Sequence, residues 1–155
     1  FELQKQVMVR LRNVKYSRCF AFFGLLDRKS SVSAPGILSH PNPEIDWIAD
    51  NQVKGISQVP AFTLHASDKF SDQIWDLSDQ ESLLLLAPIV EELMQAKILE
   101  WDTHRWRFAK PLVTFGRSHF HSADLRLSLA GDGFGGERVE RAALSGLEAA
   151  ESIGQ

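Results

Sequence analysis

A glycine-rich turn near the C-terminal end constrains the fold more than any other feature of the sequence. Residues 131–136 read Gly-Asp-Gly-Phe-Gly-Gly, between a predicted short strand at 125–130 and a predicted helix at 139–153. Glycines let backbone N–H groups approach an anionic ligand closely, and the N-terminus of a helix adds unpaired donors and a positive partial charge. The pattern G-x-G-x-x-G between a strand and a helix is typical of a dinucleotide-binding turn.

The surroundings of this turn argue against a complete dinucleotide-binding unit. Such a unit continues to a second strand that ends in an acidic residue about 20 positions further on. The sequence stops at Gln155, before such a strand forms, so we expect only the last part of a nucleotide-binding domain. Residues 1–14 already carry the apolar spacing of an amphipathic helix, which predicts a truncated or processed protein. A plain turn before a terminal helix is the alternative.

The remaining patterns predict a domain that mixes strands and helices. Alternating or continuous apolar runs predict strands at 16–26, 37–38, 44–49, 59–66 and 98–109. The cluster at 39–43 is expected to interrupt the sheet, because proline disfavours the interior of a strand. Ser78 and Glu81 form a capping box that opens a helix reaching Met94, and Pro88 is expected to kink or split this helix.

Composition and charge exclude several classes of protein. The 155 residues, 44% of them hydrophobic, suit one folded domain or one domain and a fragment of a second. A formal net charge of −3 provides no basic surface for nucleic acid. The longest apolar run, at 83–90, has eight residues and is too short to cross a bilayer. The single cysteine, Cys19, excludes an intrachain disulfide and favours a reducing, cytoplasmic location.

Three stretches of the chain follow one another in the order and spacing of a known flavoprotein family. The last stretch contains Gly131-Asp132, the glycine turn, Arg138-Val139-Glu140 and a helix of small residues with Ser145-Gly146. The two upstream stretches are Trp47-Ile48-Ala49-Asp50 followed by Leu64-His65-Ala66-Ser67, and His104-Arg105-Trp106-Arg107-Phe108-Ala109. In these features the chain resembles the amine-oxidase-like FAD oxidoreductases, and among them most closely the renalase family.

The resemblance implies an α+β, two-domain flavoprotein of which this chain is the C-terminal half. Residues 1–124 would be most of a substrate-binding domain, an antiparallel sheet with flanking helices, and 125–155 the closing strand and helix of a Rossmann-like FAD-binding domain. The implied partner is the missing N-terminal half with its pyrophosphate-binding strand, without which FAD binding is expected to be weak or absent. Arg141 departs from the family pattern, which commonly has a small residue there.

The resemblance also implies an activity and a set of site residues. The activity is hydride transfer from a small molecule, a reduced nicotinamide-type or amine substrate, to FAD, which oxygen then reoxidises. Asp132 would hydrogen-bond the ribityl or pyrophosphate part of FAD, and the N–H groups near Val139 and Glu140 would face the flavin. The implied cofactor-binding residues are Gly131, Asp132, Gly133, Arg138, Val139 and Glu140. The implied pocket residues are His65, Trp106 and Arg107.

Several alternatives stay open on sequence grounds. No catalytic residue is assigned, because the flavin carries the hydride chemistry and leaves little signature in the protein. His119, His121 and Asp124 have a spacing that metal ligands can have, but no further His or Cys completes a site. The second hypothesis for the chain is a non-catalytic binding or assembly module, a homo-oligomer that self-associates through the exposed flavin-facing surface.

Overall fold

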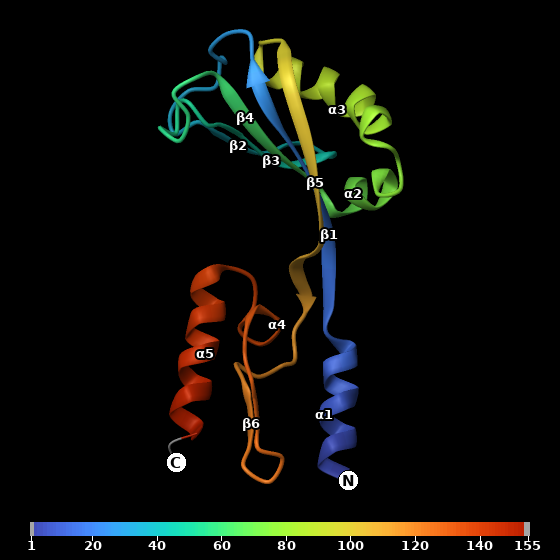
Figure 1. The fold of residues 1–155 in the computed structure, drawn as a ribbon, viewed down its shortest axis with the longest axis vertical. Coiled ribbons are helices and arrows are strands. Elements are labelled where there is room, and N and C mark those ends of the chain that lie inside the picture. The colour runs from blue at the N-terminus through green and yellow to red at the C-terminus, as the bar shows by residue number, and fades with distance from the viewer. Residues whose placement is uncertain (1, 154–155) are drawn as a thin grey trace. The chain divides into compact units, whose positions relative to one another are not determined.

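The chain has an α+β fold made of two compact units, shown in Figure 1. The structure, a computed structural model, describes residues 2–153. Unit 1 combines the two ends of the chain, Phe1–Ser17 and Phe108–Gln155, and unit 2 is the continuous segment Arg18–Arg107 between them. The predicted domain boundary after residue 124 lies within unit 1, and the assignment of 125–155 to an FAD-binding domain stays a prediction.

Unit 2 is built on a five-stranded sheet with the order β2-β3-β4-β1-β5. The strands are β1 (Lys15–Leu26), β2 (Ile37–Asn42), β3 (Ile45–Asp50), β4 (Ala61–Ala66) and β5 (Ile98–Val113). The pairs β2–β3, β3–β4 and β1–β4 are antiparallel, as predicted for this sheet. Strands β1 and β5 are long enough to continue from unit 2 into unit 1.

Helices α2 (Asp68–Ile74) and α3 (Asp79–Met94) bury their apolar sides against one face of this sheet. The sheet supplies alternate side chains to the shared core, because successive residues of a strand point to opposite faces. In β1, Phe20 and Phe22 are completely buried, and in β4, Phe62 and Leu64 are. The core also holds Leu26, Val32, Ile45, Ile48, Ala66, Ile74, Leu86, Val90, Met94 and Ala96.

The helical part of unit 2 both confirms and corrects the prediction. Ser78 and Glu81 form the expected capping box at the start of α3. Pro88 lies inside α3, but the helix is not split there and runs unbroken to Met94. Helix α2 was not expected; Ser67 caps it by accepting a hydrogen bond from the N–H of Phe70.

The prediction for β2 was wrong in its extent. The strand does not stop at the 39–43 cluster but runs through it to Asn42, which pairs with Ile45. Two features accommodate Pro41: β2 is at the edge of the sheet, and its register with β3 shifts between Ser39 and Asn42. An edge strand has one side without ladder hydrogen bonds, so a residue with no N–H is tolerated there.

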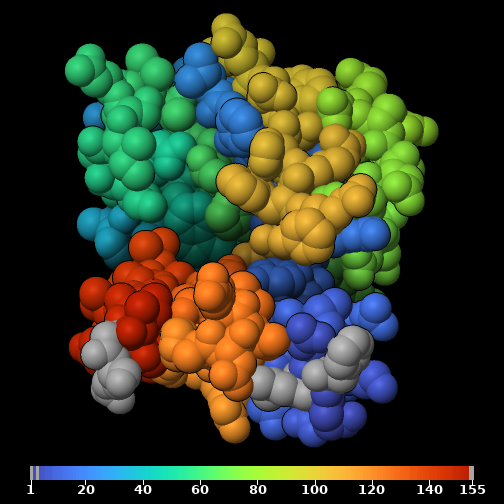
Figure 2. Space-filling model, turned by 60° about the horizontal axis from the view of Figure 1, so that its bottom comes forward, coloured from blue at the N-terminus to red at the C-terminus, as the bar shows by residue number. Residues whose placement is uncertain are grey.

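Unit 1 is smaller and has a thin core. It contains α1 (Glu2–Asn13), the antiparallel pair β6 (Phe120–Ser122) and β7 (Leu127–Leu129), α4 (Asp132–Gly135) and α5 (Val139–Ile153). The predicted strand at 125–130 is therefore three residues long, and the glycine turn contains one helical turn, α4. The β6–β7 pair lies between α5 and α1, as Figures 1 and 2 both show.

The core of unit 1 consists of Val7, Phe115 and Phe120, with other apolar side chains partly buried around them. Helix α5 contributes mainly small residues, since Ser145 and Ala149 are its buried positions. Larger side chains of α5 are exposed, including Leu147 at 62%. Among residues 2–153, no helix is both long enough and apolar enough to cross a bilayer.

Candidate functional site

The glycine turn of unit 1 is hydrogen-bonded to a serine of α5, Ser145. The N–H of Gly131 donates to Oγ of Ser145 at 2.9 Å, and the Ser145 hydroxyl donates in turn to the carbonyl of Ser118. The carbonyl of Gly131 accepts hydrogen bonds from the N–H groups of Phe134 and Gly135, which forms the single turn of α4. Ser145 is 1% exposed, so this polar connection is fully inside the unit.

The glycines of this turn serve different purposes. Gly135 allows a close approach, because a Cβ at this position would overlap the carbonyl oxygen of Arg141 in α5. Gly131 has φ of 131°, which side chains rarely adopt, and no atom lies within 4 Å of where its Cβ would be. Gly131 therefore leaves open space next to the backbone, which a ligand can approach.

Asp132 follows Gly131 and pairs with a residue from the other end of the chain. The hydroxyl of Tyr16 donates to Oδ1 of Asp132 at 2.7 Å. Burial raises the pKa of Tyr16 to about 12, the hydrogen bond and the negative charge of Asp132 add to this shift, and the N–H of Gly133 opposes it. The Tyr16 hydroxyl is therefore neutral and a donor at physiological pH.

This pair lines a groove that lies entirely within unit 1. The groove has a volume of about 610 Å3 and is formed by Leu11, Val14, Tyr16, Phe108, Ala130, Asp132, Gly133 and Phe134. Apart from the pair, the side chains around it are apolar, so a ligand would find one fixed polar contact on a hydrophobic surface. That combination is typical of small-molecule sites.

The start of α5, at Val139 and Glu140, leaves backbone donors unpaired within the helix. The first helical hydrogen bond joins the N–H of Ala142 to the carbonyl of Arg138, so the preceding N–H groups have no intrahelical acceptor. The side chains of Arg138, Val139 and Glu140 are exposed, that of Val139 at 84%. Arg141 is exposed as well and leaves the helix start accessible.

In unit 2, the sheet face opposite the helices carries His65. His65 is opposite Ala21 in β1 and opposite Trp47 in β3, and its ring centroid is 5.2 Å from that of Trp47. The ammonium of Lys54 is 4.8 Å from the centroid of Trp47, a cation–π distance. Leu64, the neighbour of His65, points into the core, so His65 must be on the other face of the sheet.

Trp106 is on the same open face of the sheet. It pairs with His104, at 4.4 Å between ring centroids, and is 52% exposed. The intervening Arg105 points the opposite way, toward the helices, with its guanidinium 4.7 Å from the ring centroid of Phe20. The structure therefore groups Trp106 with His104, and Arg107, the next residue of β5, is exposed.

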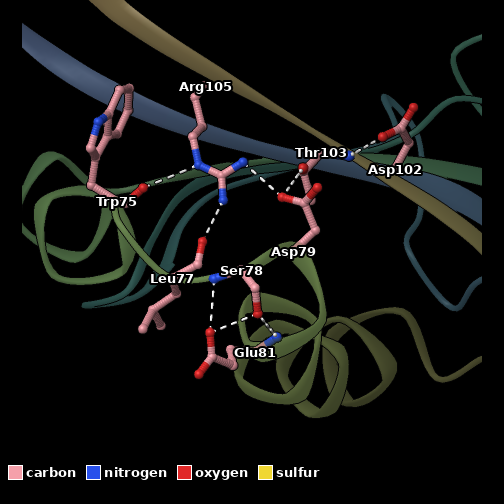
Figure 3. A network of polar contacts seen from close by, with 8 residues as sticks. All are labelled: Trp75, Leu77, Ser78, Asp79, Glu81, Asp102, Thr103 and Arg105. Atoms are coloured by element: carbon pink, nitrogen blue, oxygen red, sulfur yellow. Dashed lines mark hydrogen bonds and ion pairs between the residues drawn. The ribbon is translucent and has the colours of Figure 1, made fainter.

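Arg105 connects β5 to the helices and is drawn in Figure 3. It donates to the carbonyls of Trp75 and Leu77, which follow α2, and to Oδ1 of Asp79 at 2.7 Å. Thr103 donates to the same carboxylate oxygen. Arg105 therefore links β5 to the segment between α2 and α3 by hydrogen bonds, which is a structural role.

The histidines near the β6–β7 pair do not form a metal site in the described structure. His121 is hydrogen-bonded to Oγ of Ser128 at 2.8 Å, and His119 is 3.8 Å from a carboxylate oxygen of Glu148. Within residues 2–153, no group of three or more His, Cys, Asp or Glu side chains could hold a metal ion. His119 also has a hydrogen-bond partner, Oγ of Ser118 at 3.3 Å.

Comparison with known proteins supports the fold. No model of a protein family matches the chain. Over 94% of its length the chain is similar to a crystal structure of a "putative protoporphyrinogen oxidase" from Exiguobacterium sp. 255-15, with a TM-score of 0.65 and 15% sequence identity. The chain spans 36% of that protein's length. At this identity the similarity establishes a shared α+β fold.

Proposed function

We propose that the chain is the C-terminal part of an FAD-dependent, amine-oxidase-like and specifically renalase-like oxidoreductase. The observation that carries the proposal is the constellation in unit 1: an oriented carboxylate, Asp132, an open glycine backbone at Gly131 and the N-terminus of α5. The fold is shared with a protein named as an oxidase, which agrees with this class. Partner and location follow the same proposal: the partner is an N-terminal FAD-binding half that holds the pyrophosphate, and the location is the cytoplasm.

The described residues fit FAD in their chemistry. Asp132 is an acceptor for ligand hydroxyls in a mostly apolar groove, and the absence of a Cβ at Gly131 leaves room for a ligand beside the backbone. The N–H groups at Val139 and Glu140 suit a carbonyl-rich ring edge, where the helix dipole stabilises negative charge. FAD, when bound, supplies the hydride acceptor and passes the electrons on to oxygen.

The open sheet face of unit 2 is the proposed substrate surface. Two aromatic pairs, Trp47 with His65 and His104 with Trp106, provide flat rings against which a planar nicotinamide-type or amine substrate can pack. Lys54 beside Trp47 adds a positive charge. These residues orient the substrate and exclude water, and Arg107, exposed next to Trp106, is the third proposed pocket residue.

Amide chemical shifts of the isotope-labelled chain, followed by NMR during titration with FAD, test the proposal. Perturbations are expected to concentrate at 131–140, at millimolar FAD, because binding by this chain alone is weak. Asp132→Asn should weaken binding about tenfold, since a hydrogen bond to a charged acceptor is lost. Asp124→Asn, in the exposed turn between β6 and β7, is the matched control and should bind normally.

Two outcomes would contradict the proposal. One is the absence of perturbations at 131–140, and the other is equal FAD affinity in the Asp132→Asn variant and the unaltered chain. A visible absorption spectrum after gel filtration with FAD provides a second check. The chain is expected to emerge colourless and inactive, and a retained flavin spectrum would show that no other segment is needed to hold FAD.

A second candidate function is the self-associating module without redox chemistry. The exposed apolar side chains of α5 favour it, since Val139, Leu144, Leu147 and Ile153 are 56–84% exposed. Sedimentation over a range of concentrations distinguishes the two. A dimer that Leu147→Glu dissociates, together with no FAD perturbation at 131–140, would support the assembly module.

A further inference from the structure

The side chain of Tyr16 reaches Asp132 from outside the glycine turn. It lies at the start of β1, 116 residues from Asp132 in the sequence. Its ring packs edge-on against Phe108, with 5.7 Å between centroids and 80° between planes. All three residues belong to unit 1 and line the same groove. The side chain of Tyr16 is therefore held at its ring by Phe108 and at its hydroxyl by Asp132.

The backbone of the turn is adapted to this hydroxyl. The Tyr16 hydroxyl donates its proton to Asp132, and the backbone N–H of Gly133 acts in the opposite direction, lowering the pKa of the phenol. A Cβ at Gly133 would be 2.7 Å from the Tyr16 oxygen, closer than real Cβ contacts come. The absence of a side chain at Gly133 thus leaves the space that the Tyr16 hydroxyl occupies.

A carboxylate has two oxygens, and fixing one of them orients the other. A hydrogen bond from a neutral hydroxyl to a charged carboxylate is short and strong, and 2.7 Å is within that range. With Oδ1 engaged by Tyr16, rotation of the Asp132 carboxylate is restricted. The second oxygen is then presented in one direction without an entropic cost at the moment of binding.

We propose that Tyr16 is a positioning residue that orients the Asp132 carboxylate toward the hydroxyl-bearing polyol chain of FAD in the groove of unit 1. The inference rests on the proposed function, because it takes FAD as the ligand. It adds a residue from the opposite end of the chain to the cofactor site. It also gives Gly133 a role, which is to admit the tyrosine hydroxyl.

The sole tyrosine of the chain makes the pair directly observable. Ionisation of Tyr16 can be followed by near-ultraviolet absorbance, with no other tyrosine contributing. The pKa is expected at about 12 and should fall in Asp132→Asn, which removes the negative charge next to the phenol. Ring-labelled tyrosine gives a single NMR resonance at neutral pH, which reports the same hydrogen bond if the fold does not survive at high pH.

Binding measurements then separate positioning from mere structure. Tyr16→Phe should weaken FAD binding by about tenfold, and binding of lumiflavin, which lacks the polyol chain, should be unchanged. Gly133→Ala should displace the hydroxyl and weaken FAD binding in the same way. Gly146→Ala is the matched control, because no atom lies within 4 Å of its Cβ position.

The outcomes distinguish this inference from the proposed function. If Tyr16→Phe binds FAD like the unaltered chain while Asp132→Asn binds weakly, the positioning role is wrong and the FAD site stands. If both variants bind like the unaltered chain, the proposed function fails. Equal losses for FAD and lumiflavin in Tyr16→Phe would also overturn the inference, because they would indicate a general loss of structure.

Discussion

Each of the two units is stabilised internally by a different kind of packing. In unit 2, large side chains such as Phe20, Phe22 and Leu64 are completely buried between a sheet and two helices. Among the described residues of unit 1, the buried side chains of the core cluster are Val7, Phe115 and Phe120. Glycines and the buried hydroxyl of Ser145 make the remaining close contacts there. Stability therefore depends on apolar volume in unit 2 and on backbone fit in unit 1.

The difference also separates the proposed tasks. A closed core gives unit 2 a rigid sheet, whose open face can present aromatic side chains in fixed positions. In unit 1, the glycine turn exposes backbone at Gly131, where no side chain keeps a ligand away. The four tryptophans are all in unit 2 and the single tyrosine is in unit 1, so spectroscopy can follow the units separately.

The largest effect is expected from Leu64→Ala in the core of unit 2. Leu64 is 0% exposed, and removing a buried leucine side chain costs about 2–5 kcal/mol of unfolding free energy. Leu99→Ala is the matched control, since Leu99 is 64% exposed in β5 of the same unit. Urea unfolding followed by tryptophan fluorescence measures both. Similar losses in the two variants would mean that the core of unit 2 is not as closed as the structure shows.

The next effect concerns a buried carboxylate of unit 2. Asp50 is 1% exposed and accepts hydrogen bonds from the N–H groups of Gln52 and Val53 and from the Ser30 hydroxyl. Asp50→Ala leaves these donors without their acceptor and should cost about 2–3 kcal/mol.

Asp76→Ala, at an exposed position, should change the unfolding free energy by less than about 0.5 kcal/mol. Thermal and urea unfolding of the two variants check this difference. A loss in Asp50→Ala no larger than in Asp76→Ala would show that the loops around Asp50 do not depend on it.

In unit 1, we expect that adding a single methyl group to a glycine of the turn already lowers the unfolding free energy. Gly135→Ala places a methyl group against the Arg141 carbonyl and should cost about 1–3 kcal/mol. Gly146→Ala, in open space within α5, should be neutral or stabilising by up to about 1 kcal/mol, because alanine favours helices. Hydrogen exchange of α5 amides provides the readout. Equal protection in both variants would contradict a unit held by backbone fit.

The smallest effects on the unfolding free energy are expected from changes in pH. Unit 2 should lose stability at acid pH and unit 1 at alkaline pH. Hydrogen bonds from Arg105 and then Thr103 lower the pKa of Asp79 in unit 2 below 3.8. Its contribution to stability is complete above 3.8 and is lost as pH falls through the lower, folded pKa. The pKa of Tyr16 in unit 1 is raised from 10.0 to about 12, so its contribution is complete below 10.0 and is lost as pH rises through about 12.

Unfolding measured against pH checks both signs. Arg105→Lys should flatten the acid decline of unit 2, reported by tryptophan fluorescence. Asp132→Asn should reduce the alkaline decline of unit 1, reported by hydrogen exchange in α5. An acid decline that Arg105→Lys leaves unchanged would mean that Asp79 does not control it.

Local signals in the sequence predicted most of the fold. The capping box at Ser78, the alternation in β4, the apolar spacing of α1 and the small-residue helix α5 depend on neighbouring residues, and the structure confirms them. The extent of β2 could not be predicted, because tolerance of Pro41 depends on the strand being at the edge. Helix α2 was missed although Ser67 followed by Asp68 is an ordinary helix start.

The candidate site was predictable only in its local part. Asp132 and the glycine turn are recognisable from consecutive residues, but their partner Tyr16 is 116 positions away and carries no signal of its own. The grouping of Trp106 with His104 depends on which face of β5 packs against the helices, and the contact of Arg105 with Phe20 reveals that face only in the folded chain. Pairing of Trp47 with His65 depends likewise on strand register.

The order of the two units along the chain has a consequence for how the molecule folds. Unit 2 is one continuous segment, and its first and last strands, β1 and β5, are hydrogen-bonded neighbours. Unit 1 needs contacts across that whole segment, a loop of about 90 residues whose closure in an unfolded chain costs on the order of 4 kcal/mol of entropy. Once β1 and β5 have paired in unit 2, the ends of this loop are already close together and the entropy of closure has been lost. We therefore expect unit 2 to form before the two separate pieces of unit 1 come together.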